Sequence, residues 1–254
     1  MKLINFYNQM VRFGRQADPR KDKKSIRSFS DSAILFGNPN TEVNKLMVGI
    51  DIEVAELLLA DRIRQKEGLD LVIAHHPEGK AYAGLPEVMR LQVDLLRQAG
   101  VAQKTAVKLL EERMLEVGRR MLSANHTRPV DAARLLSIPF MNMHTPADNH
   151  VYRFLDTLFK QKKPTRVGDI ISLLEGIPEY EIAEKFNTGP RVILGSLNRP
   201  TGKILLEMTG GTEGSKDVFG ALYKAGVRTL VSMHLSEEHF KKVKDANLNV
   251  VIAG

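Results

Sequence analysis

Short apolar runs alternate along the chain with segments of helical periodicity. The runs with strand character are residues 44–51, 69–76, 139–146, 191–196, 203–210, 228–234 and 249–254. Apolar residues recur at helical spacing between them, over 54–67, 86–98, 102–122, 130–136, 147–162, 167–177, 215–226 and 236–247. The uninterrupted apolar stretch at 69–76 suits a parallel strand that is covered on both faces. The pattern therefore predicts an α/β fold, with mostly parallel sheets and flanking helices.

Breaks in this rhythm suggest how the chain is organised. A polar stretch with Pro164 separates two runs of strand and helix, so we place a boundary near residue 164. Residues 44–163 would form a first α/β lobe with a helical insertion at about 78–137, and 164–254 a second α/β portion. Residues 1–43 would form a basic N-terminal helical arm and linker.

The composition narrows the class of protein. The 254 residues include no Cys, which excludes a disulfide scaffold, Cys-ligated zinc, an iron–sulfur cluster and a cysteine nucleophile. No apolar run approaches the roughly 18 residues that a membrane span needs, and the first residues lack an apolar signal-peptide core. We therefore expect a cytoplasmic protein with no membrane partner.

The net charge of +7 is concentrated at one end of the chain. Residues 1–28 hold eight basic and two acidic side chains, which leaves a charge of only +1 for the rest. A solvated segment is the favoured interpretation; contact with phosphates or an acidic neighbouring subunit is the alternative. Aromatic residues do not interleave with the bases as a single-strand stacking platform requires, so nucleic-acid binding is not favoured.

Histidines follow the predicted strands. His75 and His76 end one strand, His144 ends the next, and His234 ends the strand at 228–234, while Asp51 ends the first. Ligands of open α/β sheets bind beyond the carboxyl ends of the strands. Imidazole and carboxylate are common ligands of divalent transition metals. These residues are therefore candidate ligands of a catalytic metal or metal pair.

Each candidate also has a structural interpretation. Adjacent residues on a strand point to opposite faces, so one of His75 and His76 could be an ordinary buried histidine, although Pro77 lets both turn to one pocket. Asp148 follows His144 at a spacing that lets both reach one metal, yet Asp148 could equally complete a capping box with Thr145. Both interpretations of this pair remain open.

Two further segments carry weaker signals. Helix-start chemistry explains Ser236 and the acidic residues after it, so His234 stands out there, and His234, Glu238 and Asp51 are possible additional ligands. Residues 209–216 form a glycine-rich turn between strand and helix, where Gly210, Gly211 and Lys216 could hold an anion. The spacing is not that of a P-loop, and a tight turn is the favoured interpretation.

Four segments together resemble the Ngg-interacting factor three family, whose members are also described as GTP cyclohydrolase I type two-like dinuclear metal-binding proteins. The segments are LVIAHHP at 71–77, HTPADN at 144–149, MTGGTEGSK at 208–216 and NVVIAG at 249–254. The resemblance covers residues from about 44 to the end. It implies a two-lobed α/β fold, a homo-oligomer that forms a ring such as a hexamer, and two metal ions in a cleft. His75, His76 and Asp148 match the family's metal ligands, with His144 beside them.

These observations lead to two hypotheses about function. The first is a metal-dependent hydrolase for a small phosphate- or nucleotide-like compound, with two divalent ions (zinc, iron, manganese, nickel or cobalt) that activate a water. The second is a non-catalytic metal-binding scaffold or regulatory protein. The family's last strand runs into further ligands, whereas this sequence stops at Gly254. We therefore expect the natural protein to be longer.

Overall fold

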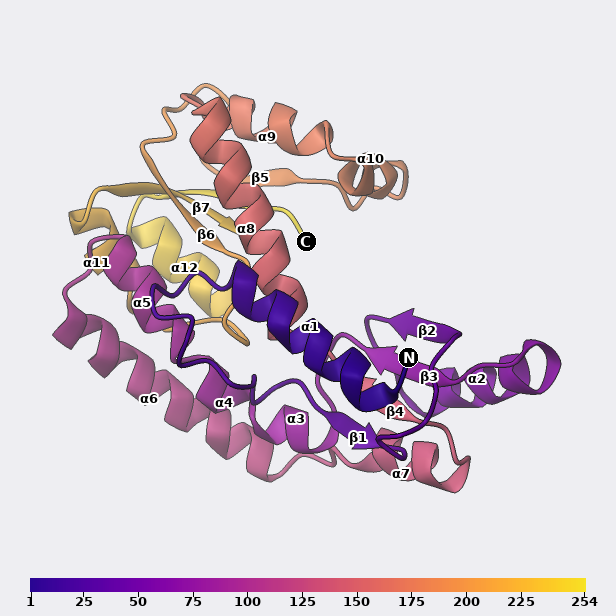
Figure 1. Ribbon diagram of the computed structural model, residues 1–254. Coiled ribbons are helices and arrows are strands. Elements are labelled where there is room, and N and C mark those ends of the chain that lie inside the picture. Colours follow the sequence, from indigo (N-terminus) through magenta and orange to yellow (C-terminus); the bar gives the residue numbers. More distant parts are fainter. The chain divides into compact units, whose positions relative to one another are not determined.

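The computed structural model describes residues 1–254 and divides them into two compact units, each built around its own sheet (Figure 1). The first unit comprises residues 1–91, 113–150 and 210–212, and the second comprises 92–112, 151–209 and 213–254. The predicted bounds of the two lobes, 44–163 and 164–254, remain a prediction. No helix is both long and apolar enough to cross a membrane.

The first unit contains a four-stranded sheet in the order β1-β4-β3-β2. Its strands are β1 (Ile34–Phe36), β2 (Leu46–Gly49), β3 (Leu71–Ala74) and β4 (Phe140–Asn142). β2, β3 and β4 are parallel, and β1 pairs with β4 in the antiparallel sense. Its helical elements are α1 (Leu3–Ala17), α2 (Val54–Glu67), α3 (Gly79–Ala83), α4 (Leu85–Val88) and α7 (Arg128–Leu135), with parts of α6 (Gln103–Leu122) and α8 (Thr145–Lys162).

Helices cover both faces of this sheet because its strand residues alternate in direction. Val72 and Phe140 point into a core with residues of α2 and α7. Ile73 and Met141 point to the opposite face, where α1 packs over them. β3 and β4 are thus buried on both sides, as the apolar run at 69–76 predicted for its strand, whereas Leu46 and Val48 of the edge strand β2 are exposed.

The N-terminal basic segment is only partly solvated. Helix α1 buries Leu3, Val11, Gly14 and Ala17, so it belongs to the core of the first unit. At Gly14, a hypothetical Cβ would lie 2.5 Å from the Cβ of Pro146, so the helix backbone sits directly against the start of α8. The charge pattern did not predict this packing, because net charge carries no information on the apolar stripe of a helix.

The second unit repeats the same sheet topology, in the order β5-β8-β7-β6. Its strands are β5 (Arg191–Leu194), β6 (Lys203–Glu207), β7 (Val227–Ser232) and β8 (Asn249–Ile252). β6, β7 and β8 are parallel, and β5 is antiparallel to β8. Its helices are α5 (Leu91–Gln98), α9 (Val167–Glu175), α10 (Pro178–Lys185), α11 (Phe219–Lys224) and α12 (Glu237–Asp245), with parts of α6 (Gln103–Leu122) and α8 (Thr145–Lys162).

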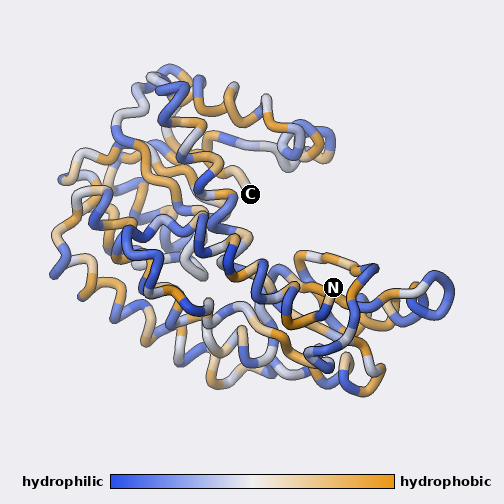
Figure 2. Tube along the Cα trace, viewed as in Figure 1, coloured by the Kyte–Doolittle hydropathy of each residue, from blue (hydrophilic) through white to orange (hydrophobic).

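Alternation again builds two cores. Leu230 and Val250 face a cluster with α5, α11 and α12. Val231 and Val251 face a cluster with α8 and α9. Figure 2 shows apolar and polar residues alternating along these helices, as expected of helices with one buried face.

The elements agree with the sequence pattern at most positions and differ at a few. The predicted mostly parallel α/β fold is confirmed, and α2 spans the predicted range of 54–67 and ends at Gly68, whose φ is 75°. The predicted helix over 86–98 is divided into α4 and α5. β1 and α10 were not predicted, and α3 falls within the predicted helical insertion without having been predicted as a separate helix. α10 begins at Pro178, directly after the predicted helix over 167–177, because proline is well tolerated in the first turn.

Candidate metal centre

The carboxyl ends of β2, β3 and β4 lie at one edge of the first sheet. The register pairs Ala74 of β3 with Gly49 on one side and Asn142 on the other. The ladder continues one step further: the His75 N–H donates to Gly49 O at 2.8 Å, and the Met143 N–H donates to Ala74 O at 3.0 Å. The segments that carry the predicted ligands therefore leave the sheet side by side.

Three of the predicted ligands come together there. His75, His144 and Asp148 each offer one ligand atom, and these atoms all lie within 4.8 Å of one another. His75 Nε2 is 3.4 Å from Asp148 Oδ1, and His144 Nε2 is 3.7 Å from Asp148 Oδ2. The side chains of His144 and Asp148 are 8% and 6% exposed, whereas His75 is 24% exposed, so the group opens to solvent on the His75 side.

The spacing of these atoms fits a shared ion. Both N···O distances exceed those of ordinary hydrogen bonds. Ligand atoms that each lie about 2.0–2.2 Å from a tetrahedral divalent ion are about 3.3–3.6 Å apart. The group of His75, His144 and Asp148 could therefore hold a metal ion.

The other ring nitrogens of the two histidines are held by acceptors. His75 Nδ1 lies 3.3 Å from Met143 O, and His144 Nδ1 lies 2.8 Å from Oδ2 of Asp31. A carbonyl or carboxylate oxygen can only accept, so each Nδ1 carries the proton. Each Nε2 is then left to face Asp148, which is the arrangement that a metal-binding histidine needs.

Burial and neighbouring charges tune the two histidines differently. Burial, followed by the proximity of His144 and His76, lowers the pKa of His75 to about 4, so His75 is neutral near pH 7. Burial also acts to lower the pKa of His144, but the hydrogen bond to Asp31 and the charge of Asp148 outweigh it and raise that pKa. Metal ligation needs the neutral imidazole, so an ion at this site would compete with a proton on His144.

His76 and Asp51 lie next to this group as a separate pair. His76 Nδ1 is 2.7 Å from Asp51 Oδ1, and the two side chains are 52% and 74% exposed. The rings of His75 and His76 have their centroids 5.2 Å apart. The structure thus gathers five predicted residues at one edge, three in the compact group and two beside it.

A buried asparagine holds the turn that presents the two histidines. Asn142 Nδ2 donates to His76 O at 2.6 Å and lies 3.4 Å from Ala74 O, while its Oδ1 accepts the Glu78 N–H at 2.9 Å. Its side chain therefore bridges β4 to the end of β3 on both sides of Pro77. Sequence reasoning missed Asn142, as well as Asp31, because neither belongs to a local motif with the residues that it supports.

Glu78 adds a carboxyl group to the same turn. Burial, followed by the charge of Glu53, raises the pKa of Glu78 to about 7, while Arg128 opposes the rise. Arg128 itself is bonded to Glu53, with Nη2 2.6 Å from Oε2. The turn after β3 thus holds an acid that is only partly ionised near neutral pH.

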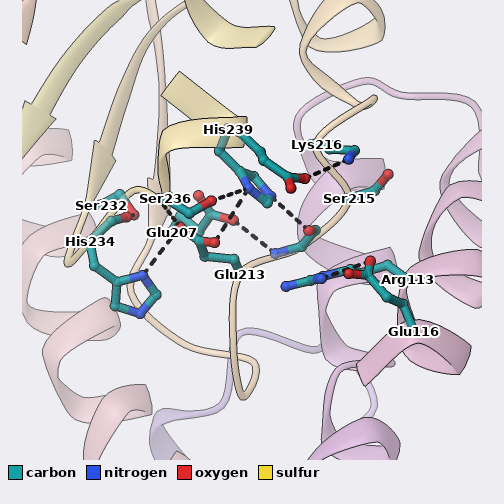
Figure 3. Close-up of polar contacts among 12 residues, drawn as sticks. Arg113, Glu116, Glu207, Glu213, Ser215, Lys216, Ser232, His234, Ser236 and His239 are labelled. Carbon is teal, nitrogen blue, oxygen red and sulfur yellow. Dashed lines mark hydrogen bonds and ion pairs between the residues drawn. The ribbon is translucent and has the colours of Figure 1, made fainter. Parts of the chain in front are cut away.

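The remaining predicted histidine belongs to a different cluster in the second unit. Figure 3 shows His234, Ser236 and His239 pointing toward Glu213. His234 Nδ1 lies 3.6 Å from Glu213 Oε1, and His239 Nδ1 lies 3.3 Å from Glu213 Oε2. The other nitrogen of His239 donates to Gly214 O at 3.0 Å, so this buried histidine pins the loop to the start of α12.

The predicted anion-binding residues are not all in one unit. Gly210 and Gly211 belong to the first unit, whereas Lys216 belongs to the second. Lys216 Nζ lies 2.6 Å from Oε2 of Glu238, so two residues that we predicted for different sites pair with each other. Within the second unit, the carboxylate of Glu207 accepts the Gly214 N–H at 3.4 Å, and burial raises the pKa of Glu207.

Solved structures resemble this chain over almost its whole length. A NIF3 superfamily protein from Sphaerobacter thermophilus is 32% identical, with a TM-score of 0.83 over 97% of this chain and 87% of that one. Reduced HcgD from Methanocaldococcus jannaschii is 16% identical, with a TM-score of 0.50 over 99% of this chain and 86% of that one. Protein ybgI, of unknown function, is 13% identical, with a TM-score of 0.51 over 100% and 87% of the two chains. The last two share the fold alone, and no protein-family model and no curated protein matches the chain.

Proposed function

We propose that this chain, which belongs to the NIF3 superfamily, binds a divalent metal ion through His75, His144 and Asp148 and uses it in hydrolysis. The observation that carries the proposal is the convergence of three ligand atoms within 4.8 Å at the carboxyl edge of a parallel sheet. A bound divalent ion would supply Lewis acidity to a substrate oxygen.

The donor set supports an ion of the first transition series. Two imidazoles and one carboxylate suit zinc, iron, manganese, nickel or cobalt, and availability often decides among them. Three protein ligands also leave a coordination position open, which is typical of catalytic sites rather than structural ones. The partial exposure of His75 gives a small molecule a route to that position.

The pair of His76 and Asp51 supports a second ion beside the first. Both side chains are exposed, and their polar atoms meet at 2.7 Å in a pair that an ion would replace. A dinuclear centre suits displacement at phosphorus, because two ions stabilise the attacking and leaving oxygens. We therefore propose a small phosphate- or nucleotide-like substrate and, by the family resemblance, a homo-oligomer.

Metal analysis tests the first part of this proposal. Purified protein should bind at least one equivalent of a divalent ion, and His75→Ala and Asp148→Asn should each abolish stoichiometric binding. His150→Ala and Asp156→Asn are the matched controls, because both residues lie on α8 outside the group. Wild-type protein that binds no divalent ion with measurable affinity would sink the proposal.

Turnover separates the enzyme from a metal-binding scaffold. The metal-loaded protein is assayed with p-nitrophenyl phosphate, its bis ester and a set of nucleotides. We expect hydrolysis that chelation removes while the circular dichroism spectrum is unchanged. Stoichiometric metal without turnover on any of these compounds would favour the non-catalytic alternative, and light scattering of the same sample reports self-association.

A further inference from the structure

Asp31 lies directly behind the group of His75, His144 and Asp148, and it is fully buried. Its Oδ2 is 2.8 Å from His144 Nδ1 and accepts the hydroxyl of Thr145 at 2.6 Å. Its Oδ1 accepts the hydroxyl of Ser32 at 3.3 Å. The ionic partner of this buried carboxylate is therefore a histidine of the metal group, rather than a lysine or an arginine.

The backbone around Asp31 is fixed from several sides. The Ala33 N–H donates to Asn142 O at 3.2 Å, and the Asn142 N–H donates to Ala33 O at 2.9 Å. Tyr7 donates its hydroxyl to Ser32 O at 2.9 Å, and Ser32 Oγ accepts the His144 N–H at 3.0 Å. The carboxylate is thus held at a defined place relative to β4 and to the turn that carries His144.

The position of Asp31 determines how the His144 ring presents itself. Because the carboxylate accepts from Nδ1–H, the lone pair of the neutral ring lies on Nε2. That atom faces Asp148, with Nε2 3.7 Å from Oδ2. A carboxylate that holds the far nitrogen of a metal-binding histidine fixes its tautomer and orientation and makes it a stronger ligand.

A purely structural role explains the burial of Asp31 less well. A buried carboxylate has a desolvation cost, and an apolar residue of similar size would fill the same space without it. Thr145 and Ser32 donate to the carboxylate, but neither needs a charged partner. The group that benefits from a full negative charge is His144.

We propose that Asp31 is a positioning residue of the metal centre: it holds the proton of His144 on Nδ1 and directs Nε2 toward the ion. This inference rests on the proposed metal binding. Asp31 acts through His144, and its carboxylate oxygens are occupied by His144, Thr145 and Ser32 rather than directed at the ion.

The test compares Asp31→Asn with Ser32→Ala and Thr145→Val. The amide of Asn fits the same space but accepts more weakly and can donate to Nδ1, which moves the ring proton to Nε2. We expect about a 10–100-fold loss of Co²⁺ affinity in Asp31→Asn, together with an altered visible spectrum of the cobalt-loaded protein. Both comparison variants leave the carboxylate. Thr145→Val removes only one donor to Asp31, so its cobalt spectrum should match that of wild type, whereas Ser32→Ala also removes the acceptor of the His144 N–H and measures that contact separately.

A second measurement needs no metal. ¹⁵N shifts of the metal-free protein, recorded at alkaline pH with labelled histidine, should assign the Nδ1–H tautomer to His144 in wild type and a changed tautomer population in Asp31→Asn. This readout separates the inference from the proposed function, because wild type could show the tautomer and still bind no metal. Unchanged cobalt affinity and spectrum in Asp31→Asn would overturn the inference. So would a loss of affinity with the His144 tautomer unchanged, because Asp31 would then act only through stability.

Discussion

The two sheets of this protein have the same strand order and different chemistry at their ends. In each, the first strand is an antiparallel edge and the other three are parallel, in the orders β1-β4-β3-β2 and β5-β8-β7-β6. Ala74 of β3 and Ser232 of β7 are the corresponding last paired residues. His75 and His76 therefore correspond to Met233 and His234, although the two halves show no sequence repeat.

The comparison separates what topology provides from what residues provide. Both sheets bring the ends of parallel strands together, so both offer a place for a ligand. Both edges carry imidazole and carboxylate groups, but only in the first sheet do three of them bring their ligand atoms within 4.8 Å of one another, with Asn142 holding the turn beside them. At the corresponding position in β8 lies Ile252, whose side chain cannot form a hydrogen bond to the neighbouring strand. The metal group is thus a property of side chains on a repeated scaffold.

The largest expected difference between the two sheets is in the effect of histidine substitutions on metal affinity. His75→Ala should lower divalent metal affinity by more than about 100-fold, because it removes one of three ligands. His234→Ala, in the second sheet, should change it by less than about twofold. Isothermal titration with Zn²⁺ or Co²⁺ measures both, and equal losses in the two variants would contradict this difference between the sheets.

A second comparison concerns Asn142 and Ile252, which occupy corresponding positions at the ends of β4 and β8. Asn142→Ala should lower the free energy of unfolding by about 1–3 kcal/mol, because it leaves the part-buried His76 carbonyl and Glu78 N–H without their side-chain partner. Ile252→Val removes one methyl group at the corresponding position and should cost about 0.5–1.5 kcal/mol. Urea unfolding of metal-free protein measures both values. If Asn142→Ala lowered the free energy of unfolding less than Ile252→Val, Asn142 would not hold the turn as described.

Acid should act on the second unit through Glu213. Burial acts to raise the pKa of Glu213, but hydrogen bonds from His234 and Ser236 outweigh it and lower that pKa to about 2. The ionised carboxylate therefore stabilises the fold fully above about pH 4.5, and this contribution is lost as the pH falls toward 2. We expect Glu213→Gln to lower the free energy of unfolding by about 2 kcal/mol at pH 7 and by much less near pH 2. Urea unfolding at several pH values checks this, and a difference that does not depend on pH would refute the assignment.

The smallest expected effect concerns the exposed pair of Lys216 and Glu238. Because both side chains are solvated, Glu238→Gln should change the free energy of unfolding by less than about 0.5 kcal/mol and leave metal affinity unchanged. Lys216→Ala serves as the reciprocal variant and also tests the predicted anion site. Inorganic phosphate binding that Lys216→Ala weakens would support that prediction, and the same low affinity in both proteins would contradict it.

Sequence patterns predicted the features that depend on local periodicity. The runs at 69–76 and 139–146 carry β3 and β4, and parallel strands place His75 and His144 at one edge. The group leaves out His76, in keeping with the opposite directions of adjacent strand residues. The sequence interpretation of Asp148 stayed open between metal ligand and cap, and the structure places its carboxylate toward both histidines.

Contacts between residues far apart in the sequence could not be predicted from local periodicity. Asp31 reaches His144 across 113 positions, and Asn142 reaches His76 across 66, with no shared motif. The net positive charge of residues 1–28 favoured a solvated segment and gave no sign that α1 packs into the core. The strand β1 is too short to give a periodic signal. The common topology of the two sheets could not be predicted from the sequence either, because the same backbone pairing is compatible with different side chains.

The close approach of Gly14 to Pro146 bears on how this protein can vary. A single added methyl group at Gly14 would meet the proline ring, and Pro146 lies two residues after His144. Any larger side chain must therefore displace either the first helix or the turn that orients the histidine. A mutational scan of α1 should find Gly14 as intolerant as a ligand, although it has no polar side chain. Evolutionary change around His75, His144 and Asp148 would thus be constrained by a helix that contributes no residue to that group.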